Sequence, residues 1–378
     1  MNGRRKYHRC LFFSFLLVTL GAFVLQRLWA MLMTPMESSP IVTFSRIRGS
    51  FTELSKKNML VKHLQVSHDF VEELTENTID QLLGQAVSLN RSKLLLLDPQ
   101  YGLGNRLRAI ASCMAFAKQT SRLLVLIWRK DVHMGAAFED LIGEYPEFMV
   151  SIPNFSPLKP VHEYLANFRV YDLMATDGVG RRKTARLETD HRHHIYLRTA
   201  FMLKSPLAQK PSTWLKKLVP LASIQDMYAP KEDVEYTVAV HIRGLSLEEE
   251  KFVAPAQAYP IRSRNFLQKW RRITGNATIF VEQMANLLRS NDRLSFFVLS
   301  DKESIIQHFK NTFFEKVFAL ENCCTTRGVK CVRCAYAGIL LASRMKGFIG
   351  SYGSSYSESI ILLGKKRHEF VKLAGVDF

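Results

Sequence analysis

A strand, a glycine loop, a helix and a second strand follow one another in residues 93–128, and this pattern constrains the fold most strongly. The apolar run 94–97 ends shortly before Gly102, and short continuous apolar runs are typical of strands buried on both faces of a parallel sheet. Apolar residues three and four positions apart then predict a helix over 103–115, and another apolar run covers 122–128. The unit predicts an α/β chain with a parallel sheet.

A second series of alternating strands and helices begins near residue 236. Its predicted strands lie at 236–243, 294–299, near 317 and at 346–350, and its predicted helices at 280–289, from 304, at 335–343 and from 355. The stretch 135–230 between the two series is rich in proline and shows no regular pattern. The two series predict two facing Rossmann-like domains, 89–230 and 231–378, with ligands at the carboxyl ends of the strands.

The composition is that of a globular chain. Of the 378 residues, 47% are hydrophobic, which is enough apolar material to bury a large core and excludes global disorder. The chain has 52 Lys and Arg against 34 Asp and Glu, so its formal charge is +18. The charge and the basic stretch 181–183 leave a nucleic-acid or anionic-glycan binder as a further alternative. A basic balance alone is a poor guide to the partner, and a luminal chain would not meet nucleic acid, so we expect no nucleic acid among the partners.

The amino-terminal residues have the pattern of a membrane anchor. Residues 1–9 are rich in basic side chains, and residues 10–33 are mostly apolar, so they can span a bilayer as one helix if Arg27 reaches the interface. The basic flank predicts a cytosolic tail and a luminal remainder, with residues 34–88 as a stem. A cleaved signal peptide is the alternative. We therefore expect a single-pass type II protein of the Golgi or endoplasmic reticulum membrane.

Sequons and cysteines are compatible with a luminal chain. N-x-S/T sequons at Asn90, Asn154 and Asn276 are candidate glycosylation sites. Four of the six cysteines lie within twelve residues, namely Cys323, Cys324, Cys331 and Cys334. In an oxidising lumen this cluster predicts disulfides, with three pairings possible. A zinc site is the alternative, although it needs a longer spacing between its cysteine pairs.

Two candidate segments follow the first strand of each series. Gly102, Gly104 and Asn105 open a predicted helix, where glycines admit a close approach of ligand and backbone and the helix N-terminus favours anions. A plain turn capped by Asn105 is the alternative. His241 and Arg243 fall on one face of the other strand, and an arginine in this place suits a phosphate group. The structural alternatives are an arginine–carboxylate pair and a buried core histidine.

Two further segments follow later strands of the second series. Asp301 is a candidate for binding a ribose or a base edge, or it caps the helix that follows. Ser354, Ser355 and Tyr356 stand at a predicted helix start and can cradle an anion, while Ser355 with Glu358 also fits a capping box. No Asp-x-Asp occurs in the chain, so we expect no metal ion.

Taken together, these segments resemble the fucosyltransferase superfamily of α1,6-, α1,2- and protein O-fucosyltransferases, over about residues 93–364. The loop 102–105 looks like the family's Gly-x-Gly-Asn loop, and residues 241–243 look like its His-x-Arg motif. Asp301 falls where the family's second motif has its acid, and residues 350–358 look like its Ser-Ser-Phe-Ser motif.

The resemblance implies a GT-B fold and the inverting, metal-independent transfer of fucose from GDP-fucose, without a cofactor, to a glycan or glycoprotein acceptor. It implies that Arg243 binds the β-phosphate and stabilises GDP as it leaves. The residues implied to hold the nucleotide sugar are His241, Asp301, Ser354, Ser355, Tyr356, Gly102, Gly104 and Asn105. Whether the protein forms a homodimer is left open.

The chain departs from the family pattern at Gly244, where many members have a second arginine, although the protein O-fucosyltransferases also lack it. The alternative functions are therefore an inactive luminal binding protein of the same fold, or a transferase that uses another GDP-sugar. The candidate general bases are Glu248, Glu249 and Glu250, or a group on the acceptor side. Trp128, Asp131 and His133 are candidates for shaping the acceptor cleft, with structural roles favoured.

Overall fold

The computed structural model describes residues 76–153, 168–174, 187, 193–228, 234–246, 249 and 261–378. All of them belong to one compact unit, Asn58–Phe378. Several predictions lie outside the described residues: the tail, the anchor, most of the stem, and the residues Asn154, Glu248 and Glu250. Within the part of the chain that is described, no helix is long and apolar enough to cross a bilayer.

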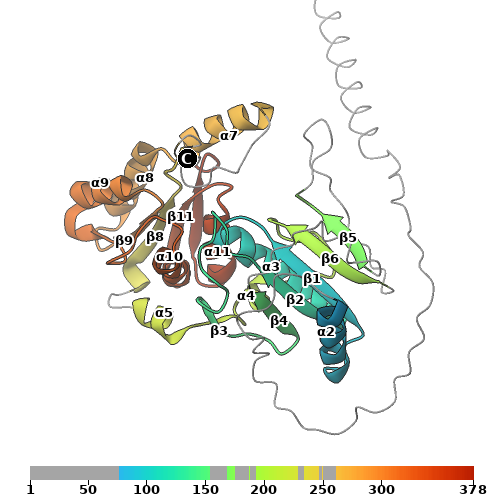
Figure 1. Ribbon diagram of the computed structural model, residues 1–378. Helices are drawn as coiled ribbons and strands as arrows, with labels where there is room; N and C mark the ends of the chain where they lie inside the picture. The colour runs from blue at the N-terminus through green and yellow to red at the C-terminus, as the bar shows by residue number, and fades with distance from the viewer. Residues whose placement is uncertain are drawn as a thin grey trace, which may run out of the picture. The chain divides into compact units, whose positions relative to one another are not determined.

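The first sheet has five parallel strands in the order β4-β2-β1-β6-β5 (Figure 1). Its strands are β1 (Lys93–Pro99), β2 (Arg122–Trp128), β4 (Met149–Pro153), β5 (Phe168–Asp172) and β6 (His194–Thr199). The accompanying helices are α2 (Glu76–Ser88), α3 (Leu103–Gln119), α4 (Pro211–Leu215) and α5 (Ala222–Met227). Two short strands, β3 (Ile142–Glu144) and β7 (Val219–Pro220), pair antiparallel beside this sheet.

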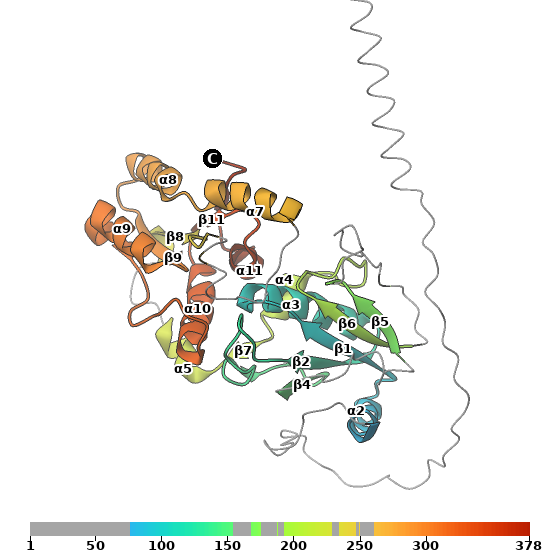
Figure 2. The same cartoon turned by 45° about the horizontal axis from the view of Figure 1, so that its top comes forward.

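The second sheet also has five parallel strands, in the order β10-β9-β8-β11-β12. Its strands are β8 (Thr237–Ile242), β9 (Ser295–Ser300), β10 (Val317–Phe318), β11 (Gly347–Ser351) and β12 (Phe370–Ala374). Its helices are α7 (Ile261–Thr274), α8 (Ala277–Ser290), α9 (Glu303–Phe313), α10 (Val329–Ala342) and α11 (Ser355–Gly364). Helices α8 and α9 cover one face of this sheet (Figure 2).

One hydrophobic core joins the two sheets. Strand alternation sends Leu94 and Leu96 of β1 toward α2, while Leu95 and Leu97 point to the opposite face and pack with α3. The cluster on that second face continues into the inner face of β8, at Ala239, and includes residues of α10 and α11. The continuous apolar run of β1 is therefore buried on both sides, as its sequence predicts.

The two parallel sheets with flanking helices confirm the predicted α/β class. The predicted division into domains at residue 230 stays a prediction. The structure adds elements that were not predicted, namely α7 at residues 261–274, β12, and the strands β4, β5 and β6 of the middle, and it begins α10 at Val329 instead of near residue 335. The early start of α10 escaped prediction because its first turns carry polar residues and two cysteines that are joined to the preceding loop.

Candidate functional site

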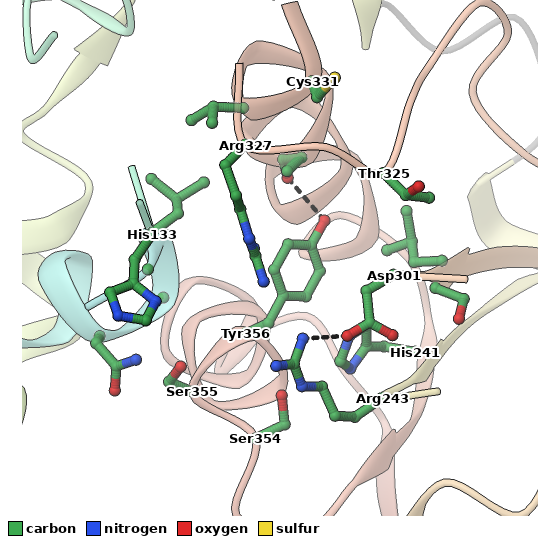
Figure 3. A pocket seen from close by; sticks show the side chains of 18 of the residues that line it. His133, His241, Arg243, Asp301, Thr325, Arg327, Cys331, Ser354, Ser355 and Tyr356 are labelled. Carbon is green, nitrogen blue, oxygen red and sulfur yellow. Dashed lines mark hydrogen bonds and ion pairs between the residues drawn. The ribbon is translucent and has the colours of Figure 1, made fainter. Parts of the chain in front are cut away.

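A cavity of about 1020 Å³ lies where the carboxyl ends of β8 and β9 meet the first turns of α3 and α11 (Figure 3). Its wall also includes the loop between β10 and α10. The residues that the sequence proposed for nucleotide-sugar binding all line it: Gly102, Gly104, Asn105, His241, Arg243, Asp301, Ser354, Ser355 and Tyr356. The four sequence segments, up to about 250 residues apart in the chain, thus share one cavity.

Helices α3 and α11 approach each other closely at their N-termini. A Cβ added to Gly104 would lie 2.5 Å from the backbone carbonyl of Ser355 and 2.7 Å from the nitrogen of Tyr356, so only a glycine fits. The Ser359 hydroxyl donates a 3.3 Å hydrogen bond to the Gly104 carbonyl. The Arg108 guanidinium of α3 pairs with the Glu358 carboxylate of α11. Two positive helix ends are therefore held side by side at the cavity.

The first turn of α11 is free of side-chain capping. Its N-cap is Ser354, whose hydroxyl makes no capping bond, and Glu358 is turned toward Arg108. The capping-box prediction for Ser355 and Glu358 was therefore wrong, because the carboxylate is recruited by an arginine that sequence distance hid. The first N–H groups of a helix have no acceptor within the helix, and here Ser354, Ser355 and Tyr356 all line the cavity.

Arg243 is clamped by Asp301. Its guanidinium donates to the Asp301 carboxylate, which also accepts backbone N–H bonds from Gly244 (2.7 Å) and Leu245 (3.1 Å). Burial would raise the pKa of Asp301, but the Arg243 charge and the two N–H donors hold that pKa below its usual value. Asp301 stays ionised and does not cap α9, whose N-cap is Lys302. The capping alternative for Asp301 was wrong.

The backbone of Arg243 is fixed by contacts that the sequence analysis missed. The Arg243 N–H donates to the Ser351 hydroxyl (3.0 Å), and that hydroxyl donates to the Thr274 carbonyl (2.6 Å). A Cβ on Gly275 would lie 2.4 Å from the Arg243 carbonyl oxygen, so α7 ends against this strand. The serine at the end of β11 was a detectable signal, because parallel strands end at a common edge.

His241 is a buried neutral imidazole. Its Nδ1 shares a 2.8 Å hydrogen bond with the Ser357 hydroxyl, and its ring stacks on Tyr356 with centroids 4.6 Å apart. Burial lowers the pKa of His241 to about 4. The charge of Asp301 partly opposes this shift, and the charge of Arg243 adds to it. The Tyr356 hydroxyl donates to the Ala335 carbonyl at 2.7 Å. These contacts orient the floor of the cavity without adding charge to it.

The loop between β10 and α10 contributes residues that the sequence analysis did not propose for binding. Disulfides join Cys323 to Cys334 and Cys324 to Cys331, which resolves the pairing left open by the sequence. These four cysteines and the loop residues Thr325, Thr326 and Arg327 all line the cavity. His133 and Trp270 line it as well. Nothing in the local sequence of this loop places it at the site, because only the fold brings it to the cavity.

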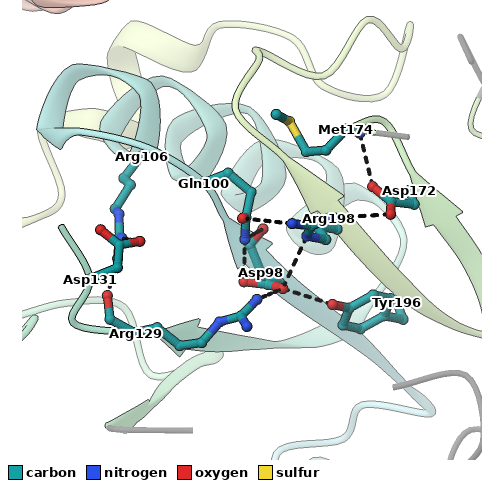
Figure 4. Close-up of polar contacts among 9 residues, drawn as sticks. All are labelled: Asp98, Gln100, Arg106, Arg129, Asp131, Asp172, Met174, Tyr196 and Arg198. Carbon is teal, nitrogen blue, oxygen red and sulfur yellow. Dashed lines mark hydrogen bonds and ion pairs between the residues drawn. The ribbon is translucent and has the colours of Figure 1, made fainter. Parts of the chain in front are cut away.

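A polar network supports the carboxyl ends of the first sheet (Figure 4). Asp98 is 1% exposed and accepts hydrogen bonds from Tyr196 Oη (2.8 Å) and Gln100 Nε2 (2.7 Å), and Arg129 pairs with it. Beside it, Arg106 pairs with Asp131 at 2.8 Å. This network is a scaffold, because none of these residues lines the cavity.

Of the three candidates for the acceptor cleft, only His133 lines the cavity, whereas Trp128 and Asp131 do not. Trp128 is buried and donates from Nε1 to the Ala136 carbonyl (2.8 Å), and Asp131 pairs with the buried Arg106. Both therefore have structural roles, as the sequence analysis favoured. His133 lines the cavity, and its ring meets that of Tyr101 edge on, with centroids 5.4 Å apart.

The remaining candidates lie outside the cavity lining. Glu249 pairs with Lys302 at 2.6 Å and also accepts a hydrogen bond from the Ser246 N–H. These two contacts lower the pKa of Glu249 to about 2, so its carboxylate is a weak base. Asn276 caps α8 by accepting from the Thr278 N–H (3.1 Å) and is exposed, as is Asn90. In the described part of the chain no three His, Cys, Asp or Glu residues gather as metal ligands would.

Comparisons with known proteins give structural matches only. No protein-family model matches the sequence, and no curated protein matches it. Fucosyltransferase NodZ from Bradyrhizobium is 14% identical over 75% of this chain and 97% of its own, with a TM-score of 0.47. POFUT1 in complex with GDP is 14% identical over 75% of this chain and 98% of its own, with a TM-score of 0.47. A mutant of Arabidopsis thaliana FUT1 in complex with GDP is 12% identical over 76% of this chain and 72% of its own, with a TM-score of 0.46. All three proteins are fucosyltransferases.

Proposed function

We propose that this protein is a glycosyltransferase of the GT-B type that transfers fucose from GDP-fucose to a glycan or glycoprotein acceptor, with inversion and without a metal ion. The observation that carries the proposal is the meeting of Arg243, the first turn of α11 and the first turn of α3 at one cavity. An arginine and two helix N-termini are the groups that proteins use to bind a diphosphate.

The geometry suits the departure of a nucleoside diphosphate. In the proposed reaction an acceptor hydroxyl oxygen attacks C1 of fucose, the bond from C1 to the β-phosphate oxygen breaks, and the electron pair leaves on GDP while the proton of the hydroxyl passes to solvent water. Attack from the face opposite the leaving group inverts C1. Arg243 and the N–H groups of α11 supply fixed donors where negative charge develops, which is the largest single contribution in many enzymes.

The surroundings of Arg243 keep it ready for this role. Asp301 and Ser351 hold its guanidinium and backbone before any ligand arrives, so little reorganisation is needed during the reaction. His241 carries no charge near neutral pH because burial lowers its pKa to about 4. The positive charge at this end of the cavity therefore comes from arginine, and it does not change over the physiological pH range.

We also propose a type II arrangement in the Golgi or endoplasmic reticulum membrane, with the cavity on the luminal side. The basic and apolar pattern of residues 1–33 supports an anchor, with a cleaved signal peptide as the alternative. The two disulfides support a luminal address, because such bonds persist in oxidising compartments.

Gly244 favours a second candidate function, an inactive binding protein that keeps the nucleotide site. Many fucosyltransferases have a second arginine at this place, and Gly244 offers no side chain to replace it. A transferase for another GDP-sugar uses the same diphosphate contacts and is a further alternative.

Turnover of the donor distinguishes these functions. The purified full-length protein is incubated with GDP-fucose, GDP-mannose or a UDP-sugar in the presence of EDTA, and release of the nucleoside diphosphate is measured. We expect GDP release from GDP-fucose, lost by at least about a hundredfold in Arg243→Ala, as for removal of one donor to a developing anion. Arg289→Ala is the matched control, because Arg289 is exposed on α8.

Release of GDP from GDP-mannose but not from GDP-fucose would indicate that the protein uses another GDP-sugar as its donor. No release from any sugar nucleotide, by protein that still binds GDP, would favour the inactive binding protein. Activity that EDTA abolishes and a divalent ion restores would contradict the metal-independent proposal.

A further inference from the structure

The loop 319–328 is built into the cavity by two disulfides. Cys323–Cys334 and Cys324–Cys331 tie two adjacent loop residues to the first two turns of α10. The Thr326 hydroxyl donates a 2.8 Å hydrogen bond to the Cys331 sulfur, which adds a third link. A surface loop is ordinarily mobile, and these covalent links restrict this one strongly.

The same loop is anchored on the other side of the cavity. The Gly135 N–H donates a 2.9 Å hydrogen bond to the Arg327 carbonyl, and a Cβ on Gly135 would lie 2.5 Å from that oxygen. Gly135 follows β2 of the first sheet, whereas Arg327 precedes α10 of the second. The backbone of Arg327 is thus fixed from both sides.

The side chain of Arg327 points into the cavity. Figure 3 shows its guanidinium passing the ring of Tyr356 toward the first turn of α11, whereas Arg243 approaches that turn from the strand side. Both arginine side chains therefore end near the helix start at Ser354 and Ser355.

The charges of the lining match a diphosphate. Among the described lining residues there are three arginines, Arg243, Arg271 and Arg327, and one acid, Asp301. The lining thus carries a net charge of +2, whereas the diphosphate of a nucleotide sugar is negatively charged. Asp301 already neutralises much of the charge of Arg243, so the remaining positive charge of the lining comes from Arg271 and Arg327.

Gly244 has no side chain and adds no charge to the cavity. A Cβ at Gly244 would point at α9, 2.3 Å from Ile305 Cδ1 and 3.2 Å from Lys302 Cβ, and Gly244 does not line the cavity. In this chain the position of the family's second arginine faces a helix.

We propose that Arg327, presented by the disulfide-linked loop, binds the diphosphate of the nucleotide sugar together with Arg243. The inference rests on the proposed donor site and extends it. It also makes donor binding dependent on the oxidised state of the two disulfides, since reduction frees the loop that carries Arg327.

The test is the affinity of the full-length protein for GDP and for guanosine, measured calorimetrically in EDTA. Arg327→Met removes the charge, Arg327→Lys keeps it, and Arg333→Met is the matched control. Arg333 lies on α10 and pairs with Asp140 at 3.2 Å, outside the cavity lining. We expect Arg327→Met to weaken GDP binding by at least about tenfold, as for the loss of a charged hydrogen bond, while guanosine binding changes less than about twofold.

The other two variants follow from the same contact. Arg327→Lys should retain part of the GDP affinity, and Arg333→Met should bind GDP as the unmodified protein does. Unchanged GDP affinity in Arg327→Met, or equal losses for GDP and guanosine, would overturn the inference and leave the proposed function intact. If the unmodified protein does not bind GDP at all, the proposed function itself fails.

The role of the disulfides is tested by mild reduction of the folded protein. Reduction should weaken GDP binding by the unmodified protein and leave the already weakened binding of Arg327→Met unchanged, because both act on one contact. An equal further loss in Arg327→Met would show that the disulfides do not act through Arg327, and would overturn that part of the inference.

Discussion

Arg243 is held by neighbours on three sides before any ligand is bound. Asp301 takes its guanidinium, Ser351 accepts its backbone N–H, and Gly275 lies against its carbonyl. An arginine in an ion pair is often only structural, and the sequence around Arg243 is compatible with that alternative. Here the ion pair and the binding role are compatible, because the guanidinium has five N–H donors and the arginine also lines the cavity.

His241 makes stability depend on pH. Burial lowers its folded pKa to about 4, while the unfolded chain has the ordinary value of about 6.5. Between these two values the unfolded state binds a proton that the folded state does not. The free energy of unfolding should therefore fall as the pH drops from about 7 to about 5.

The prediction is checked with His241→Asn, whose side chain does not titrate. Chemical denaturation at both pH values should show a loss of stability that is about 1–2 kcal/mol larger in the unmodified protein than in the variant. Burial also lowers the pKa of His194 and His368, but both residues are present in the two proteins and cancel in the difference. Equal losses would contradict a buried neutral His241.

At the scale of elements, the contact between α3 and α11 determines the site. Gly104→Ala would place a methyl group 2.5 Å from the Ser355 carbonyl, and the backbone of α11 must then move. We expect the free energy of unfolding to fall by about 1–3 kcal/mol, as for other overpacked contacts, and GDP binding to weaken.

Gly84→Ala is the control for this prediction. Gly84 is an exposed glycine within α2, with open space where the Cβ would stand. Alanine there should raise the free energy of unfolding by about 0.5–1 kcal/mol through helix propensity. If thermal or chemical unfolding shows Gly104→Ala to be as stable as the unmodified chain, the close approach of the two helices is contradicted.

Predictability differed between elements for physical reasons. The runs 94–97 and 122–128 are buried on both faces, so continuous apolar sequence revealed β1 and β2. Strand β5 is partly exposed and β6 contains Arg198 and polar residues, so neither stood out in the proline-rich middle. Helix α7 was missed because basic residues interrupt its apolar positions along the sequence.

The candidate site was predictable where short sequence segments contain its residues. Glycines, a strand arginine and a serine-rich helix start revealed the segments around Asn105, Arg243 and Ser354. The partners of these residues were not predictable, because pairs such as Arg108 with Glu358 are 250 residues apart in the chain. Arg327 escaped for a similar reason, since only the folded loop brings it to the cavity.

At the scale of the molecule, one core and one cavity connect the two sheets. The hydrophobic cluster that includes Leu97 of β1 also includes Ala239 of β8, and the Gly135–Arg327 hydrogen bond links loops from the two sheets. The cavity is lined by elements from both halves of the described chain, so a ligand bound there should stabilise all of them together.

The most direct test of the central claim is thermal unfolding of the full-length protein with GDP, GDP-fucose or UDP in the presence of EDTA. A guanine nucleotide at about a hundred times its dissociation constant should add about 2.7 kcal/mol of stability and raise the Tm by about 5–10 °C. UDP should give no shift, Arg243→Ala should lose the shift, and Arg289→Ala should keep it. A Tm that GDP leaves unchanged, or that rises equally in Arg243→Ala, would contradict a diphosphate site at Arg243.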